Sequence, residues 1–210
     1  MSTQLHHPPQ TPVPEMVRRF DRTVERWFTQ VRRRPALDRL AYGLSEAGNH
    51  SLVWHGINLV DAVVGPAITG DPTRRRRAIR RSALQGIEQA VVNGPVKLVF
   101  RRQRPVPLDD HPHDLRVPQT SSFPSGHSSA GACAATLLSL DLGHPALWYS
   151  LATAIGWSRV HVGVHHPSDV VGGAVIGLAL AAVASAAWPP PARPAAAPAS
   201  TPEPDPRPRR

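Results

Sequence analysis

Apolar residues along this chain gather in five blocks, which cover residues 51–69, 82–100, 126–142, 145–160 and 169–188. A helix that crosses a membrane needs about 20 mostly apolar residues, with about 17 as a practical minimum. Only the last block meets this standard convincingly by itself. Its many small residues allow close contact between helices, and Trp188 at its end is typical of a membrane interface.

The first two blocks carry polar residues that leave a soluble helical bundle open as an alternative. These are His55, Asn58 and Asp61 in the first block, and Gln85, Glu88, Gln89 and Asn93 in the second. The mean hydropathy of -0.24 is low for a membrane protein, but tails rich in arginine and proline depress this average. The alternation of β-strands is absent, and alanine and leucine dominate the apolar blocks. We therefore predict an all-α, membrane-embedded helical bundle.

Residues 16–35 are predicted to form a basic amphipathic helix before the first block. One face carries the apolar residues, and the opposite face is rich in arginine. This pattern is typical of a helix in a lipid headgroup layer, although a surface helix packed on the protein's own core would share it. Residues 36–188 are then the membrane domain. Residues 1–15 and 189–210, rich in proline or alanine, are predicted to be flexible tails.

Positive charge narrows the possible partners. The formal net charge is +9, and Lys97 is the only lysine, so almost all of the positive charge is arginine. This balance favours nucleic acid, acidic lipid headgroups or phosphorylated substrates, without choosing among them. Cys133 is the only cysteine, which excludes an intramolecular disulfide and a cysteine-based zinc site. The start of the chain also lacks the pattern of a cleavable signal peptide.

The first chemically distinctive segment is K-L-V-F-R-R-Q-R-P at residues 97–105. Lys97 and Arg104 are seven residues apart, about two helical turns, so we predict that they share one helical face and that Pro105 ends the helix. Two cations there fit a tetrahedral oxyanion, since the arginine fork can contact phosphate through two hydrogen bonds. Taken alone, the segment also fits an ordinary basic flank of an apolar helix.

The second segment is F-P-S-G-H-S-S-A-G at residues 123–131, which indicates a helix start. Unpaired N–H groups and the positive end of the helix dipole at Ser125 and Gly126 would attract an anion, and Gly126 has no side chain to block its approach. His127 beside that anion could give a proton to a leaving oxygen. A simple helix cap with an incidental histidine is the alternative.

The third segment is S-R-V-H-V-G-V-H-H-P-S-D at residues 158–169. His165 and Asp169 are four residues apart across a predicted helix start at Pro167. The carboxylate could accept a hydrogen bond from one imidazole nitrogen and leave the other free to attack. Arg159 would add a further cation.

Together the three segments resemble the signature of the phosphatidic acid phosphatase type 2 (PAP2) superfamily. That signature is a lysine, six residues and Arg-Pro; then Pro-Ser-Gly-His; then Ser-Arg, five residues, His, three residues and Asp. Every fixed position is matched, by Lys97, Arg104, Pro105, Pro124, Ser125, Gly126, His127, Ser158, Arg159, His165 and Asp169. The resemblance covers roughly residues 90–185 and implies a PAP2-type helical bundle.

The resemblance also implies a role for each residue. His165 would form a phosphohistidine intermediate, Asp169 would orient it, and His127 would be the general acid. The phosphate would be held by Lys97, Arg104, Ser125, Gly126 and Arg159. No metal or other cofactor is expected. His161, His165 and Asp169 could resemble a zinc site, but the nearby cations would repel a divalent ion. His161 and His166 are therefore expected to pack or to line the pocket.

Charge also predicts the topology. Residues 73–81, T-R-R-R-R-A-I-R-R, form the densest basic cluster between two apolar blocks and are therefore expected to face the cytoplasm. Alternation of the blocks then places all three segments on the extracytoplasmic side of the cell membrane. It also places the arginine-rich N-terminal helix outside, against the charge rule, unless residues 36–50 form an additional short or re-entrant span.

A site at a membrane surface points to a lipid-linked phosphate or diphosphate, such as a polyprenyl phosphate, phosphatidate or prenyl-sugar phosphate, in a membrane with anionic lipids. Nucleic acid is not expected as a partner. One alternative is an enzyme similar to vanadate-dependent haloperoxidases, because vanadate mimics phosphate. The other is a non-catalytic basic protein that binds membrane or nucleic acid, which would explain the arginines but not the histidines.

Overall fold

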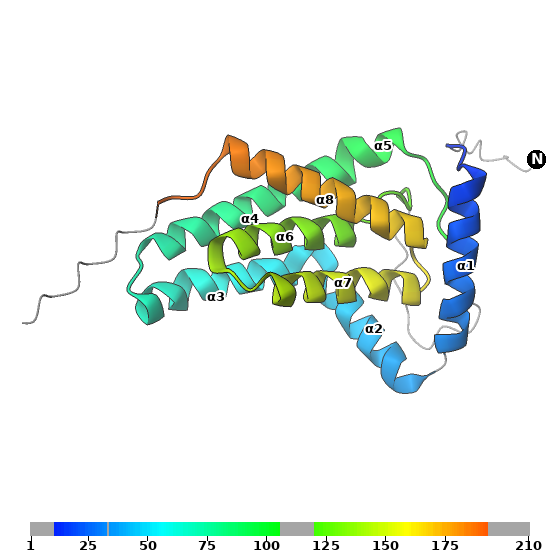
Figure 1. Cartoon of the computed structure of the whole chain (residues 1–210), viewed down its shortest axis with the longest axis horizontal. Coiled ribbons are helices and arrows are strands. Elements are labelled where there is room, and N and C mark those ends of the chain that lie inside the picture. Colours follow the sequence, from blue (N-terminus) through cyan, green and yellow to red (C-terminus); the bar gives the residue numbers. More distant parts are fainter. Residues whose placement is uncertain (1–10, 33, 106–119, 193–210) are drawn as a thin grey trace, which may run out of the picture.

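The computed structural model describes residues 11–32, 34–105 and 120–192, and these contain helices and no strand. The principal helices are α1 (Glu15–Val31), α2 (Pro35–Ala47), α3 (Leu52–Thr69), α4 (Thr73–Val91), α6 (Gly126–Leu142), α7 (Pro145–His161) and α8 (Pro167–Ala187). In Figure 1, α3, α4, α6, α7 and α8 run along the long axis, and α1 lies across one end. The predicted all-α bundle is confirmed. The two predicted tails lie largely outside the described residues.

A sharp break joins α2 to α3. The 3₁₀ turn η1 (Asn49–Ser51) contains two residues in the left-handed region, His50 at φ 51° and Ser51 at φ 59°. Helix α2 packs on α7 and leans away from the bundle (Figure 1), and α3 then runs beside α4. Residues 36–50 thus contribute a further helical segment, which begins at the end of the bundle that carries α1.

The basic segment at residues 73–81 is not a loop, because α4 already begins at Thr73. Arg81, which is only 1% exposed, donates from Nε to Asn58 Oδ1 at 2.8 Å and from Nη1 to Asp141 Oδ2 at 2.7 Å. It also pairs with Asp61. Asn58 and Asp61 of the first apolar block are therefore partners of this arginine, as expected for ionisable groups inside a membrane bundle.

The predicted helix at residues 82–100 is also interrupted. After α4 the chain forms a π-helical turn, η2 (Val92–Val96), with a kink at Gly94, followed by the short helix α5 (Lys97–Val99). Pro95 cannot donate a backbone hydrogen bond, which favours such a break. Residues 100–105 are not helical, so the prediction that Lys97 and Arg104 share a helical face is wrong, and Pro105 does not end the helix.

Helices α6 and α8 make the closest contact in the bundle. A Cβ atom on Gly173 would clash with the backbone of Ser125, and one on Gly177 would clash with the backbone of Ser129. The small residues of the last block thus allow the two backbones to touch, as the sequence predicts. Cys133 is buried in the adjoining core.

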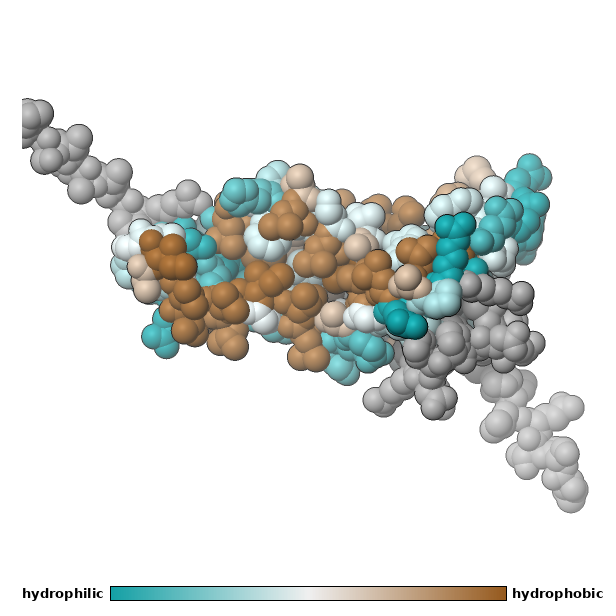
Figure 2. All heavy atoms as spheres, turned by 90° about the horizontal axis from the view of Figure 1, so that it is seen from below, coloured by the Kyte–Doolittle hydropathy of each residue, from teal (hydrophilic) through white to brown (hydrophobic). Residues whose placement is uncertain are grey.

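The outer surface of the bundle is apolar, as expected for a membrane protein. Among the described residues, Asn49–Thr69 and Pro167–Ala187 are long and apolar enough to cross a membrane. Exposed side chains on α3 and α8 include Leu59, Val63, Val175 and Val183. Figure 2 shows apolar side chains over most of one side of the bundle, with polar ones gathered chiefly at the end that carries α1.

Candidate active site

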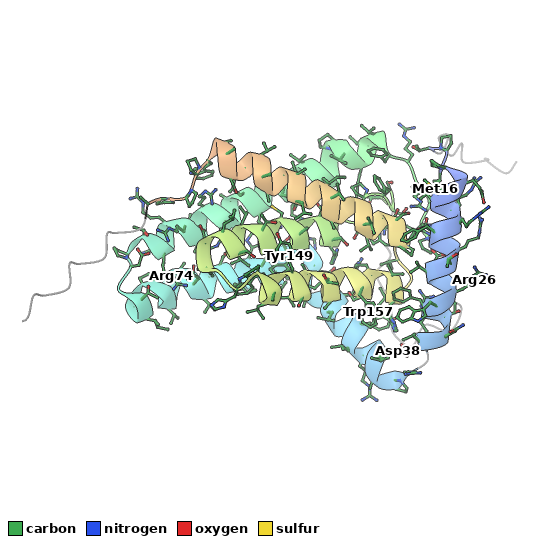
Figure 3. All side chains as sticks on the ribbon, in the orientation of Figure 1. Met16, Arg26, Asp38, Arg74, Tyr149 and Trp157 are labelled. Atoms are coloured by element: carbon green, nitrogen blue, oxygen red, sulfur yellow. The ribbon has the colours of Figure 1, made fainter. Side chains whose placement is uncertain are left out.

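The three distinctive segments meet at one end of the bundle. This end contains the start of α6, the end of α7, the start of α8 and the extended chain after α5, and α1 lies across it (Figure 1). The opposite end holds Arg74, far from Met16 and Arg26 on α1 (Figure 3). The sequence prediction that the segments converge on one side of the bundle is therefore confirmed.

His165 lies in the turn between α7 and α8 and is only 3% exposed. Its Nε2 atom is 3.3 Å from Arg104 Nη1. Because arginine has donors and no acceptor, Nε2 must present its lone pair. The ring proton then belongs on Nδ1, which faces Asp169 Oδ2 at 3.6 Å. This separation is longer than a hydrogen bond, so the carboxylate faces the ring without yet bonding to it.

The electrostatics keep this imidazole neutral. Burial, with a smaller contribution from the cationic Arg104 and Arg159, lowers the pKa of His165 from 6.5 to about 3, against the opposing effect of Asp169. A neutral imidazole with an unprotonated Nε2 is the form that can act as a nucleophile.

Asp169 is fully buried in the first turn of α8 and is held by other donors. Arg102 Nη1 donates to Oδ1 at 2.6 Å, and the His166 N–H donates to Oδ2 at 2.9 Å. The Asp169 carbonyl oxygen accepts from the Ser125 N–H at 3.0 Å. The carboxylate is thus fixed in place independently of His165.

Arg104 lies in the extended chain after α5, and its side chain reaches His165. Its guanidinium donates to the carbonyl oxygens of Val164 at 2.8 Å and of Thr120 and Ser121 at 3.2 Å. Burial lowers its pKa from 12.5, but the group stays charged because arginine is so strongly basic.

Arg159, on the last turn of α7, brings a second buried guanidinium to the site. Its side chain donates to Ser45 Oγ of α2, and its Nε atom has no partner in the part of the chain that the structure describes. Lys97 on α5 is close enough to interact electrostatically with both Arg104 and Arg159. Three cations gathered in a poorly solvated place repel one another, so the arrangement favours a bound anion.

His127, in the first turn of α6, reaches the break between α2 and α3. Its Nε2 is 3.0 Å from Asn49 Oδ1, while Asn49 Nδ2 donates to Glu46 Oε2 at 3.0 Å. Gly48 makes room for the ring, since a Cβ atom there would lie 2.6 Å from His127 Cδ2. The ring is therefore positioned by α2 and η1 as well as by its own helix.

The helix start at Ser125 and Gly126 is confirmed, but its donors differ from the prediction. Ser125 caps α6 through its side chain, and its N–H is already bonded to Asp169. Among the described residues the N–H groups of Gly126 and His127 have no acceptor, so these are the donors left for an anion. The missing side chain of Gly126 serves contact with Asn93, since a Cβ atom would lie 2.8 Å from Asn93 Oδ1.

The two neighbouring histidines pack against carboxylates. His161 Nε2 is 2.8 Å from Asp38 Oδ1 of α2, and His166 Nδ1 is 2.7 Å from Glu25 Oε1 of α1. Sequence reasoning missed four residues that support the site, namely Asp21, Ser45, Asn49 and Arg102. The clearest signal was Gly48-Asn49, which marks a helix break.

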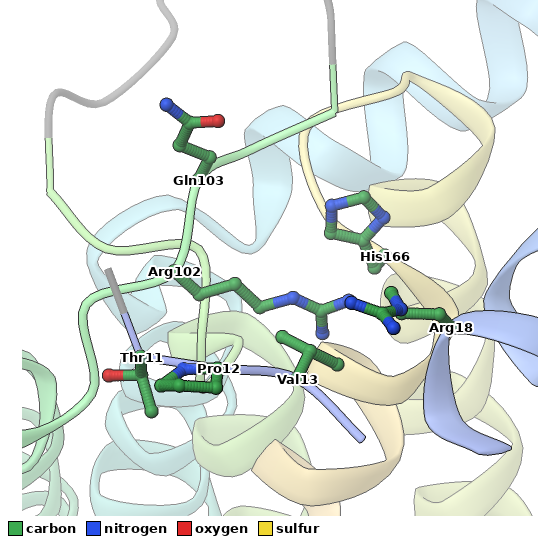
Figure 4. A pocket seen from close by; sticks show the side chains of 7 residues that line it. All are labelled: Thr11, Pro12, Val13, Arg18, Arg102, Gln103 and His166. Atoms are coloured by element: carbon green, nitrogen blue, oxygen red, sulfur yellow. The ribbon is translucent and has the colours of Figure 1, made fainter. Parts of the chain in front are cut away.

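A cavity of about 350 Å³ opens beside the site, between the segment that precedes α1 and the extended chain after α5. Arg18, Arg102, Gln103 and His166 line it together with Thr11, Pro12 and Val13 (Figure 4). Among these lining residues, Arg102 is the one that also binds Asp169.

Comparison with known proteins agrees with this geometry. Residues 84–191 match the PAP2 superfamily. The decaprenylphosphoryl-5-phosphoribose phosphatase of Mycobacterium tuberculosis is 33% identical over 153 residues, 71% of this chain and 80% of that protein. The undecaprenyl-diphosphatase BcrC of Bacillus subtilis is 32% identical over 112 residues, 50% of this chain and 55% of that protein.

Solved structures support the same fold. A transmembrane PAP2 type phosphatidylglycerolphosphate phosphatase from Bacillus subtilis matches with a TM-score of 0.62 and 24% identity, over 82% of this chain and 86% of that one. LpxE from Aquifex aeolicus matches with a TM-score of 0.59 and 26% identity, over 77% and 92%. With its helical membrane fold and the family match across half its length, this chain belongs to the PAP2 superfamily and is a phosphatase.

Proposed function

We propose that this chain hydrolyses a lipid-linked phosphate or diphosphate at a membrane surface, with His165 as the nucleophile. The observation that carries the proposal is the buried lone pair of His165 Nε2, which faces Arg104 at 3.3 Å. Lys97, Arg159 and the Gly126 N–H complete a cationic cradle around it. Such a site attracts a phosphoryl group and stabilises the charge that develops on it.

The reaction takes two steps. His165 Nε2 attacks phosphorus and forms an N–P bond, while the bond from phosphorus to the lipid oxygen breaks. That oxygen takes a proton from His127. In the absence of substrate, burial and the nearby Arg159 lower the pKa of His127 well below its usual range, so the imidazolium that gives this proton forms only beside the negative charge of the bound phosphate. The ring then exchanges Asn49 Oδ1 for the leaving oxygen. Water then attacks phosphorus and gives a proton back to His127, the N–P bond breaks, and inorganic phosphate leaves. Asp169 holds the proton-bearing Nδ1 throughout.

The names of the relatives favour a polyprenyl-linked substrate over phosphatidate. Two relatives that are more than 30% identical, from Mycobacterium tuberculosis and Bacillus subtilis, are named for a decaprenyl-linked sugar phosphate and an undecaprenyl diphosphate. Both names combine a long isoprenoid with a phosphate ester or anhydride. We therefore infer that the substrate of this chain is a polyprenyl phosphate, diphosphate or sugar phosphate.

The distribution of charge between the two ends of the bundle supports one orientation in the membrane. The basic start of α4 lies at the end opposite the site, which supports a cytoplasmic position for that end and an extracytoplasmic site in the cell membrane. At the site end, α1 exposes Met16 and Trp27 beside a row of arginines. We infer that α1 lies in the headgroup layer and binds anionic lipids.

Release of inorganic phosphate from a short-chain polyprenyl phosphate in detergent tests the mechanism. His165→Ala is expected to abolish release while the protein stays in the membrane fraction. His144→Asn is the matched control, because His144 is exposed at the far end and asparagine tolerates its left-handed backbone. Unchanged release by His165→Ala would sink the proposal, and halide oxidation without phosphate release would favour the haloperoxidase alternative.

A further inference from the structure

A buried carboxylate from outside the three motifs reaches the site. Asp21 lies in the middle of α1 and is only 3% exposed. It accepts hydrogen bonds from the Ser168 N–H and from Ser168 Oγ, both at 2.8 Å, and from Arg102 Nη2 at 2.6 Å. A buried charge needs such a full set of partners, so its position is closely specified.

Arg102 connects this carboxylate to the site. Its Nη2 binds Asp21, while its Nη1 binds Asp169 Oδ1 at 2.6 Å and Ser168 Oγ at 2.7 Å. The guanidinium is thus shared between two carboxylates, one from α1 and one from α8. Both terminal nitrogens of Arg102 donate to carboxylates, and only Nη1 donates to Asp169.

This sharing matters because an arginine fork readily binds both oxygens of a single carboxylate. If both Nη atoms rested on Asp169, its Oδ2 atom would lose the position in which it faces His165 Nδ1 at 3.6 Å. We infer that Asp21 is a positioning residue, which holds one arm of Arg102 so that Asp169 Oδ2 remains directed at His165. The inference rests on the proposed function of His165 and Asp169.

Asp21 could instead serve only to attach α1 to the bundle, and the structure offers a way to separate the two roles. Helix α1 has further anchors that do not touch Arg102. Glu25 pairs with His166 at 2.7 Å, Phe28 packs against Trp157, and Arg32, just beyond α1, donates to the Val160 carbonyl at 2.6 Å. Glu25 binds the ring of His166, whereas Asp169 is bound by the backbone N–H of His166. A variant at one of these anchors therefore loosens α1 while Arg102 and this backbone N–H remain the donors to Asp169.

The experiment compares Asp21→Asn with Glu25→Gln in the full-length protein, by steady-state release of phosphate from a short-chain polyprenyl phosphate. Asp21→Asn is expected to lower kcat about tenfold or more, with KM changed by less than about threefold, because it displaces an orienting group and no substrate contact. Glu25→Gln is expected to keep kcat within about twofold. Asp21→Glu, which restores the charge, is expected to recover part of the lost kcat.

The dependence on Arg102 is tested by a double-mutant cycle. Arg102→Lys keeps a positive charge, but an ammonium group lacks the two terminal nitrogens with which arginine binds two carboxylates at once. Adding Asp21→Asn to Arg102→Lys is expected to change kcat by less than about twofold, since both act through one contact. Equal losses of kcat in Asp21→Asn and Glu25→Gln, or fully additive effects in the cycle, would overturn the inference.

These experiments distinguish failure of the inference about Asp21 from failure of the proposed function. If His165→Ala keeps its activity, the proposed mechanism itself is wrong, whatever the Asp21 variants do. If His165→Ala is inactive while Asp21→Asn keeps the wild-type kcat, only the positioning role of Asp21 is wrong. Thermal unfolding of each variant in detergent shows whether a lost kcat reflects a lost fold.

Discussion

Asp169 Oδ2 faces His165 Nδ1 at 3.6 Å, while its Oδ1 is held by Arg102 at 2.6 Å. The carboxylate is therefore anchored before any substrate arrives, and the imidazole needs to move by less than an ångström to form a hydrogen bond with it. We expect this bond to tighten as positive charge develops on His165 during the attack.

The first prediction follows from that geometry. Asp169→Asn keeps the shape of the side chain but removes the charge that stabilises the developing imidazolium, so we expect kcat to fall by about 100-fold or more, with a smaller change in KM. Steady-state kinetics with a short-chain polyprenyl phosphate measure both constants. A raised KM with an unchanged kcat would show that Asp169 contributes to substrate binding instead.

The second prediction concerns pH. Because the pKa of His165 is about 3 in the folded protein and about 6.5 in an unfolded chain, the unfolded state binds more protons between these values. The stability gained from burying a neutral ring is therefore complete above pH 6.5 and is lost as the pH falls. His165→Gln removes this contribution, so between pH 7.5 and 5 we expect its stability relative to wild type to improve by about 2 kcal/mol.

Unfolding in detergent at the two pH values measures the difference between the variant and the wild type. His144→Asn again provides the control, since it removes an exposed histidine at the far end of the bundle. A His165→Gln variant whose stability falls in parallel with the wild type would contradict the neutral, buried imidazole.

The third prediction concerns Arg159, whose Nε has no partner among the described residues. In the absence of substrate this buried cation repels Lys97 and Arg104, so Arg159→Met is expected to raise the stability by about 1 kcal/mol, or ~3 °C in Tm, while activity is lost. Orthovanadate, a phosphate mimic, should raise the Tm of the wild type and not that of the variant. Arg32→Met, which removes a cap on the α7 carbonyls, should lower the Tm.

The fourth prediction tests the contact between α6 and α8. A Cβ atom on Gly173 would meet the backbone of Ser125, which cannot move away as a flexible side chain would. Gly173→Ala should therefore cost about 1 to 3 kcal/mol and displace the helix start that carries Ser125 and Gly126. Gly86→Ala has open space around it and should be neutral or slightly stabilising in the same unfolding measurement.

Features that depend on residues close together in the sequence could be predicted from the local sequence pattern. The start of α8 at Pro167, the helix start at Ser125, and the meeting of the three motifs at one end were all predicted from spacing and apolar blocks. The roles of the site residues stay predictions, to be tested by the variants described above.

The remaining features depend on contacts between distant segments, which spacing does not reveal. The prediction that Lys97 and Arg104 share a helical face was wrong because α5 ends at Val99 and the chain is already extended at Phe100, before it reaches Arg104. Asp21 meets Arg102 only because α1 folds back across the end of the bundle, with 81 positions between them in the chain. Asn49 reaches His127 because two left-handed residues turn α2 away from α3.

The buried arginine at the far end implies an order of events during biogenesis. Arg81 is enclosed by Asn58, Asp61 and Asp141, which come from α3 and α6. When α4 first enters the membrane, α6 has yet to follow, so Asp141 is not there to neutralise it. Of the two carboxylates only Asp61 of α3 is then present, so part of the positive charge of this segment stays unpaired and would favour the proposed cytoplasmic position of this end. Once α6 has inserted, Asp141 can pair with Arg81, and this side chain then links α3, α4 and α6.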